Sequence, residues 1–247
     1  MGTMRFRAII TGLLFIIAST TAVIGYMLYG PIIDGPDYLV NGAARGNLVV
    51  LGALNEFILA CAAIGTGLML YPHLRRHDES LALGYVCFRF FEAVVITVGL
   101  VGVLALLSVS RDFAGSSAPD AEAFRATGTA LLAVREWAFI LGPGVLLGLN
   151  TSMYSYVLFR TRLVPRPIAA MGMTGAALVL IAGLLMLLDV LQPMSPGAGL
   201  LSATVAVYEM VLAAWLIAKG FNAEAVAPAP TTVAMGTFQV AAAAGRG

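Results

Sequence analysis

Six long apolar segments are the feature of this sequence that most constrains its fold. A helix needs about 20 apolar residues to cross a bilayer, and each segment reaches that length. They run from about Ala8 to Tyr29, Leu48 to Tyr71, Leu83 to Ser108, Glu136 to Phe159 (with an alternative start near Thr127), Ile168 to Leu191 and Leu200 to Lys219. The sequence therefore predicts an all-α, polytopic membrane bundle of about six transmembrane helices.

The composition supports a lipid environment. Hydrophobic residues make up 60% of the chain and charged residues only 11%, whereas a soluble domain carries roughly 25% charged residues. So little charge could not cover a globule of this size with polar surface. The net charge of +1 gives no basic face of the kind that binds nucleic acid. We expect the lipid bilayer as a partner and no nucleic acid.

The basic residues predict the orientation of the spans. They gather before the first segment, between the second and third, and between the fourth and fifth, as Arg5, Arg7, Arg75, Arg76, Arg160, Arg162 and Arg166. The alternate loops hold fewer. Because basic loops stay in the cytoplasm, an even number of spans places both termini inside. The first segment is longer than the 7–15 residues usual for a signal-peptide core and reads as a retained span.

The chain divides into two regions by composition. Residues 1–222 form one six-helix transmembrane domain. Residues 223–247 are rich in Ala, Pro and Thr, with few large apolar side chains. Because such a segment cannot bury enough surface to fold, we expect a disordered cytoplasmic tail.

Two stretches near the C-terminal end carry a family resemblance. One reads Arg160-Thr-Arg-Leu-Val-Pro-Arg-Pro-Ile, and the other runs from Tyr208-Glu-Met through Trp215-Leu-Ile to Lys219-Gly-Phe-Asn. Together with Arg89-Phe-Phe-Glu92 they resemble the bacterial domain of unknown function 4386 family, over about Met4 to Asn222. The resemblance implies a six-helix protein of the bacterial inner membrane. It implies no activity.

Several ionisable or polar residues fall inside the apolar segments, where each charge costs roughly 2.5–3.5 kcal/mol. They are Glu56, Arg89, Glu92, Asn150 and Glu209. At 1.5 Å per residue, Glu92 and Glu209 lie near mid-membrane, and the i,i+3 spacing lets Arg89 pair with Glu92. Glu56 and Glu209 then share Arg89, face a wet cavity, or carry a proton. We expect these five residues to form a mid-membrane polar cluster.

The cluster supports two interpretations. It is either a buried network that fixes helix packing, or a pathway for protons, ions or a small polar solute. We predict an uncharacterised, non-enzymatic membrane protein that is permease-like or proton-coupled. The alternatives are an intramembrane enzyme that uses a carboxyl of raised pKa, and a membrane partner or sensor subunit. The sequence identifies no protein partner.

The fourth segment contains Gly142-Pro143-Gly144, followed by Gly148. Pro removes a backbone hydrogen bond and kinks a helix, while Gly144 and Gly148 suit close helix contact. These residues predict either packing around a kink or a hinge that lines a binding site.

The remaining motifs indicate neither a metal nor a cofactor. His73 and His77 have i,i+4 spacing beside Asp78 and Glu79, but a zinc site needs three or four ligands, and hydrated loop residues explain this pattern. The sequence contains no Gly-x-Ser-x-Gly and no phosphate loop. We predict no catalytic residues. Cys61 and Cys87 read as small buried hydrophobic residues.

Overall fold

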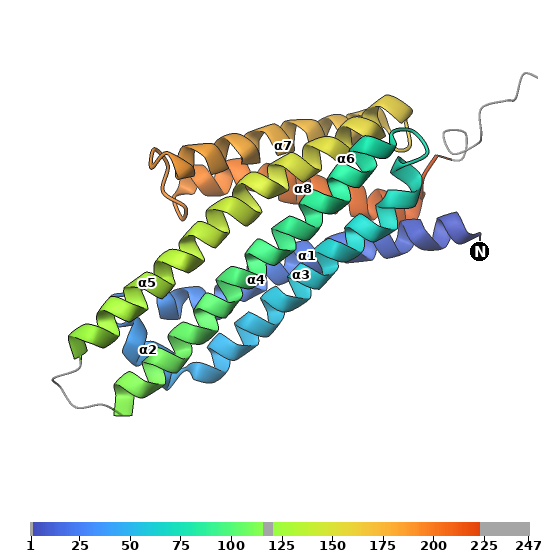
Figure 1. Ribbon diagram of the computed structural model, residues 1–247. Coiled ribbons are helices and arrows are strands. Elements are labelled where there is room, and N and C mark those ends of the chain that lie inside the picture. Colours follow the sequence, from blue (N-terminus) through green and yellow to red (C-terminus); the bar gives the residue numbers. More distant parts are fainter. Residues whose placement is uncertain (1, 116–120, 223–247) are drawn as a thin grey trace, which may run out of the picture.

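The computed structural model describes residues 2–115 and 121–222, and these residues form helices joined by short turns (Figure 1). In chain order the elements are α1 (Thr3–Ile33), α2 (Tyr38–Ala44), α3 (Gly46–Leu74), α4 (Glu79–Gly115), α5 (Ala121–Phe139), the π-helix η2 (Ile140–Leu146), α6 (Leu147–Thr161), α7 (Arg166–Leu187) and α8 (Pro196–Ala218). No strand occurs in the described ranges. The all-α prediction is confirmed.

Six helices are long and apolar enough to cross a membrane. They are α1, α3, α4, α7, α8 and the fourth span, which consists of α5, η2 and α6 in one continuous rod of 41 residues, Ala121–Thr161. The chain is thus a multi-pass membrane protein, as the apolar segments predicted. Its orientation in the membrane stays a prediction, and the predicted tail, 223–247, lies outside the described residues.

The spans differ in length more than the apolar segments suggested. α4 has 37 residues and α7 only 22, which at 1.5 Å per residue gives about 56 Å and 33 Å. The hydrocarbon core of a bilayer is only about 30 Å thick. In Figure 1, α4 and α5 run past the ends of α7 and α8. We call this end the distal end, because both described chain ends lie at the other one.

The short helix α2 was not predicted. It packs against α4 at the distal end, where Leu39 is buried beside Val103, Leu106 and Leu107. Its sequence, Tyr-Leu-Val-Asn-Gly-Ala-Ala, is too short and too polar for a span, so a search for spans passes over it.

The fourth span packs closely on α7 through glycines. A Cβ atom on Gly183 would lie 2.8 Å from the carbonyl carbon of Gly144, and one on Gly148 would lie 2.7 Å from Cβ of Leu180. These two backbones approach as only small residues allow. Gly144 and Gly148 therefore serve close packing, whichever further role the kink has.

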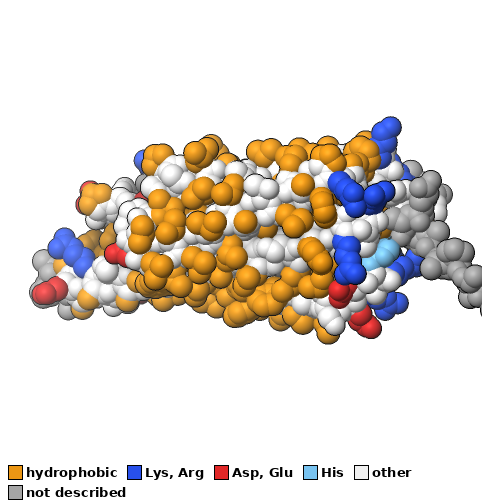
Figure 2. Space-filling view, turned by 90° about the horizontal axis from the view of Figure 1, so that it is seen from above, with side chains coloured by type: hydrophobic (Ala, Val, Ile, Leu, Met, Phe, Trp, Pro, Cys, Tyr) orange, Lys and Arg blue, Asp and Glu red, His pale blue; other side chains and the backbone are white. Residues whose placement is uncertain are grey.

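Figure 2 shows an apolar band around the middle of the molecule, with basic side chains gathered toward one end. Large apolar residues such as Phe90, Phe91 and Leu68 are more than half exposed, as expected of side chains that contact lipid tails. Cys61 and Cys87 are also exposed. The expectation that both cysteines are buried was therefore wrong, because apolar residues of a membrane span can face lipid as readily as protein.

Candidate functional site

Three charged side chains meet inside the bundle, and with two polar neighbours they form what we call the central cluster: Arg89, Glu92, Glu209, Asn150 and Ser19. Nη1 of Arg89 lies 2.9 Å from Oε2 of Glu92, and its Nη2 lies 3.8 Å from Oε1 of Glu209. These three residues are only 3–6% exposed. A single guanidinium thus faces two carboxyl groups in the protein interior.

Polar groups from neighbouring helices complete the central cluster. Asn150 donates a 2.6 Å hydrogen bond to Oε2 of Glu92, and Ser19 donates one of 2.8 Å to Oε2 of Glu209. Nε of Arg89 donates to Oγ1 of Thr66. The cluster residues come from α1, α4, α6 and α8, and Thr66 adds α3, so the cluster and this neighbour connect five of the six spans.

The charges of the central cluster do not balance. With both carboxyl groups ionised it carries one negative charge in excess, and it is neutral when one carboxyl holds a proton. Glu209 is the weaker partner of Arg89, since its Oε1 lacks a hydrogen bond within the described residues. An uncompensated buried charge is costly, so the arrangement suits the binding of one proton.

A second group, the distal cluster, consists of Tyr29, Glu56 and Arg135. The Tyr29 hydroxyl donates to Oε1 of Glu56 and accepts from Nη2 of Arg135. Nη2 of Arg135 also lies 3.5 Å from Oε1 of Glu56, and its guanidinium carbon lies 4.7 Å from the centre of the Tyr29 ring. One carboxylate is matched by one cation.

The expectation that Glu56 joins the mid-membrane cluster needs correction. Glu56 pairs with Arg135, while Arg89, Glu92, Asn150 and Glu209 lie together as described above. Arg135 was left out of the predicted cluster because a fourth segment that starts at Glu136 puts it at the end of the span, although a start near Thr127 was also considered. The helix itself starts at Ala121, so Arg135 lies within a continuous helix and contacts side chains of α1 and α3.

An apolar layer of α3 and α4 side chains separates the two clusters. Glu56 and Ala63, whose carbonyl accepts from Nε of Arg89, are seven residues apart on α3, or about 10 Å along the helix. The buried side chains of this layer include Ala60, Ala93 and Ile96. In this conformation no ion pair of the described residues joins one cluster to the other.

A cavity of about 710 Å³ opens at the distal end, beside the distal cluster. The residues that line it include Tyr26, Asp34, Tyr38, Arg135, Glu136, Gln192 and Ser195. Arg135 belongs to both the cavity and the ion pair. Asp34 accepts a 3.3 Å hydrogen bond from the Tyr26 hydroxyl, and partial burial raises the pKa of its carboxyl above the ordinary value. Hydroxyl, carboxyl, amide and guanidinium groups together suit a small polar solute.

The fourth span connects the two clusters. Arg135 lies before η2 and Asn150 after it, and Gly142, Pro143 and Gly144 lie within η2 itself. π-Helical segments are rare and occur frequently at functional sites. Pro143 supplies no backbone N–H, which accounts for the irregular hydrogen bonding there. The predicted hinge residues thus occupy an irregular turn between the two ionic sites.

A tyrosine group that sequence reasoning missed lies between the central cluster and the end that holds the chain termini. Tyr85 donates to Oγ1 of Thr66, and Ser155 lies 3.0 Å from the Tyr208 hydroxyl. The Tyr154 ring lies 5.0 Å from that of Tyr85, and its hydroxyl has no hydrogen-bond partner among the described residues. A tyrosine in an apolar segment can lie at the membrane interface or inside the bundle, and the sequence alone does not distinguish the two positions.

The two histidines have different surroundings. His73 belongs to the last turn of α3, is 3% exposed and stacks on Phe221 at 4.3 Å between ring centres, so it is not the hydrated loop residue that we expected. His77 is exposed in the following turn, where burial of part of the ring and the charge of Arg76 lower its pKa. No group of three metal-binding side chains occurs within residues 2–115 and 121–222.

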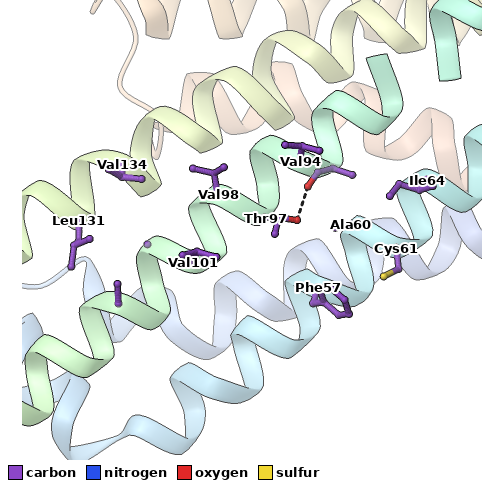
Figure 3. A pocket seen from close by; sticks show the side chains of 13 residues that line it. Phe57, Ala60, Cys61, Ile64, Val94, Thr97, Val98, Val101, Leu131 and Val134 are labelled. Carbon is purple, nitrogen blue, oxygen red and sulfur yellow. Dashed lines mark hydrogen bonds between the residues drawn. The ribbon is translucent and has the colours of Figure 1, made fainter. Parts of the chain in front are cut away.

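An apolar groove of about 460 Å³ lies between α3, α4 and α5 (Figure 3). Its walls include Phe57, Cys61, Val98 and Val134. The hydroxyl of Thr97, which also lines it, donates to the carbonyl of Ala93. The groove is therefore suited to lipid tails and offers little to a polar solute.

Comparisons with known proteins agree with this architecture. The family model described as a domain of unknown function (DUF4386) matches residues 10–220, which include all the residues of both clusters. No curated protein and no solved structure matches the chain. A match over so much of the sequence leads to one conclusion: the chain belongs to the DUF4386 family.

Proposed function

We propose that this membrane protein is a permease-like carrier that moves a small polar solute together with a proton. The observation that carries the proposal is the central cluster, in which two carboxyl groups share one guanidinium at 3–6% exposure. Ionisable residues are retained inside membrane proteins chiefly where they bind or move ions and protons. The spare carboxyl gives this cluster a proton site.

The distal cavity supplies the solute site in this proposal. Its volume of about 710 Å³ is within the range of small-molecule sites. Arg135 lines it and also holds Glu56, so a solute that binds Arg135 competes with an ion pair of the protein. Such competition gives the solute a way to favour a second conformation.

In this proposal the fourth span connects the solute site with the proton site. A change at Arg135 is transmitted through η2 to Asn150, whose amide donates to Glu92. Because Pro143 and the flanking glycines already interrupt regular hydrogen bonding, this turn rearranges at lower cost than a regular helix. Transport also requires that the apolar layer between the clusters open during the cycle.

The geometry favours a carrier over the enzyme alternative. An intramembrane enzyme that uses Glu92 or Glu209 needs a cavity that leads substrate to the carboxyl. Neither residue lines the distal cavity or the apolar groove, and both are nearly inaccessible. The partner or sensor alternative has no comparable support from the described surface.

We also propose a location for the protein and an orientation of its helices in the membrane. The inner membrane of a bacterium fits the family resemblance, and the basic loops support a cytoplasmic position for the chain termini. The distal cavity then opens on the periplasmic side.

Reconstituted vesicles test the proposal. The purified protein is placed in liposomes that contain a pH-sensitive dye, and a panel of amino acids, carboxylic acids and amines is added under an imposed pH gradient. We expect at least one class of solute to change the internal pH in step with its uptake. Glu209→Gln, which cannot hold the extra proton, should abolish the coupling.

The matched control is Glu122→Gln, the same chemical change at an exposed residue of α5. It should transport like wild type. Coupled uptake that persists unchanged in folded Glu209→Gln would remove the central cluster from the mechanism. Absence of pH-linked flux for every class of solute, with protein shown to be folded, would overturn the proposal as a whole.

A further inference from the structure

A second polar pocket lies at the opposite end of the bundle from the distal cavity. It has a volume of about 470 Å³, and the residues that line it include Arg162, Arg166, Trp215, Lys219 and Phe221. We call it the basic pocket. It brings together the two C-terminal stretches on which the family resemblance rests, joined by a hydrogen bond from the Asn222 amide to the carbonyl of Leu163.

Three cations border the basic pocket, and no carboxylate of the described residues lines it. Arg162, Arg166 and Lys219 are exposed, and none forms an ion pair with an acidic residue in the described part of the chain. Arg166 lies over the Phe159 ring at 5.4 Å, which fixes its direction while its donors stay available. The pocket therefore offers concentrated positive charge.

Local backbone structure holds this arrangement in place. Arg162 ends α6 with a φ of 57°, a left-handed conformation that is costly for a residue other than Gly, Asn or Asp. The last carbonyls of α8, Leu216, Ile217 and Ala218, accept hydrogen bonds from the guanidinium of Arg5. Because Arg5 already donates hydrogen bonds to the last carbonyls of α8, the Lys219 side chain is not needed to cap this helix.

The position of the basic pocket identifies the source of its ligand. It lies where α6 and α8 end, which in a chain of six membrane spans is where headgroups are expected, and Trp215 and Phe221 give it an apolar wall. Trp residues are enriched at this level of a membrane. Basic pockets between transmembrane helices bind anionic headgroups, while their apolar walls contact the acyl chains.

We propose that the basic pocket binds the phosphate headgroup of an anionic phospholipid from the adjacent leaflet. Arg162, Arg166 and Lys219 bind the phosphate oxygens, and Trp215 and Phe221 contact the first methylene groups of the lipid. This site is independent of the proposed transport function, since none of its residues belongs to the central or the distal cluster.

The experiment measures lipid binding to the full-length protein in mild detergent by native mass spectrometry and by thermal shift. Phosphatidylglycerol, phosphatidylethanolamine and inorganic phosphate are added separately. We expect phosphatidylglycerol to bind and to raise the melting temperature, and the other two to have little effect. Arg162→Asn/Arg166→Gln should bind phosphatidylglycerol about 30-fold more weakly, since each basic residue contributes roughly a fivefold effect.

The control is Arg75→Gln/Arg76→Gln, which removes the same charge from exposed residues at the same end of the bundle but outside this pocket. It should keep wild-type binding. Arg166→Gln/Lys219→Gln repeats the test without altering the left-handed residue. Equal losses in the control and pocket variants would overturn the proposal in favour of a diffuse basic surface, and a full response to inorganic phosphate would overturn the lipid assignment.

Discussion

The central and distal clusters solve the problem of buried charge in different ways. In the distal cluster one carboxylate, one guanidinium and one tyrosine hydroxyl satisfy one another, and the charged side chains are 13–14% exposed beside a cavity. In the central cluster one guanidinium serves two carboxyl groups whose side chains are 5% and 8% exposed. The central cluster, whose side chains are less exposed to solvent, is thus the one whose charges do not balance.

In the proposed cycle this difference gives the two clusters different roles: the central cluster binds the proton, and the distal cluster contributes Arg135 to the solute cavity. A balanced pair near water is what helix packing alone would produce, because each partner removes the cost of the other. A buried site with one more carboxyl group than cations adds a free-energy cost that helix packing does not require. Variants of the two clusters can test whether this distinction is real.

The largest effect is expected at Arg89. Arg89→Met leaves Glu92 and Glu209 in the interior without a cation, and breaking a buried pair in this way typically costs about 3–5 kcal/mol. Thermal unfolding in detergent measures the loss, with Arg76→Met as an exposed control. The triple variant Arg89→Met/Glu92→Gln/Glu209→Gln should regain most of the stability. If it does not, the loss came from packing of the long side chain.

A smaller loss is expected at Glu56. Glu56→Gln removes the carboxylate that matches Arg135, but the nearby cavity lets water reach the guanidinium, so we expect about 1–3 kcal/mol. The comparison is made by thermal unfolding beside Glu136→Gln, an exposed neighbour of Arg135. Equal stability of the two variants would mean that the distal pair contributes nothing to the fold.

Glu209→Gln should change stability by less than about 1 kcal/mol, because Glu92 alone then matches Arg89 and the amide oxygen still accepts from Ser19. The same unfolding assay applies, and Glu92→Gln should be the more harmful substitution because it removes the 2.9 Å pair. A loss for Glu209→Gln as large as that for Arg89→Met would make the central cluster a packing device and remove the contrast with the distal one.

The smallest effect is a pH dependence at Asp34, at the mouth of the distal cavity. Its pKa in the folded protein is raised above 3.8 by burial, against the opposing effects of the Tyr26 hydrogen bond and the charge of Arg135. Between 3.8 and that higher pKa the folded state binds more protons than the unfolded state, so stability falls as pH rises through this window.

Asp34→Asn should remove this slope and leave the protein slightly more stable than wild type at neutral pH. Melting temperatures of both proteins across about pH 4 to 7 measure it. Parallel curves would show that Asp34 titrates as it does in the unfolded chain.

The sequence was sufficient for the number of membrane spans and for their helical form, because the length and apolarity of a span follow from the thickness of a bilayer. It was also sufficient to select Arg89, Glu92, Asn150 and Glu209, since charge at mid-membrane depth is rare. The i,i+3 spacing also predicted the pair of Arg89 with Glu92, which is confirmed, but the sequence left the partners of Glu56 and Glu209 open. Those partners depend on how the helices are rotated and packed, and Glu56 pairs with Arg135 of the fourth span.

The conformation of single turns and the burial of single side chains were harder to predict than the ion pairs. Pro143 and its glycines indicated a kink, but the π-helical form depends on how the turn packs against Gly183 of α7. The burial of His73 and of the tyrosine group follows from contacts between distant segments, such as that of His73 with Phe221. No local pattern carries such information.

The unequal lengths of the spans give the distal end a stepped rim. α4 and α5 stand as a tall wall, while α7 and α8 stop at a low turn that contains Gln192 and Ser195. A molecule that approaches along the membrane normal meets the wall, whereas one that diffuses within the headgroup layer passes over the turn. In the proposed transport cycle this step in the rim favours a solute that first partitions into the interfacial layer, which concentrates it in two dimensions before it reaches the cavity.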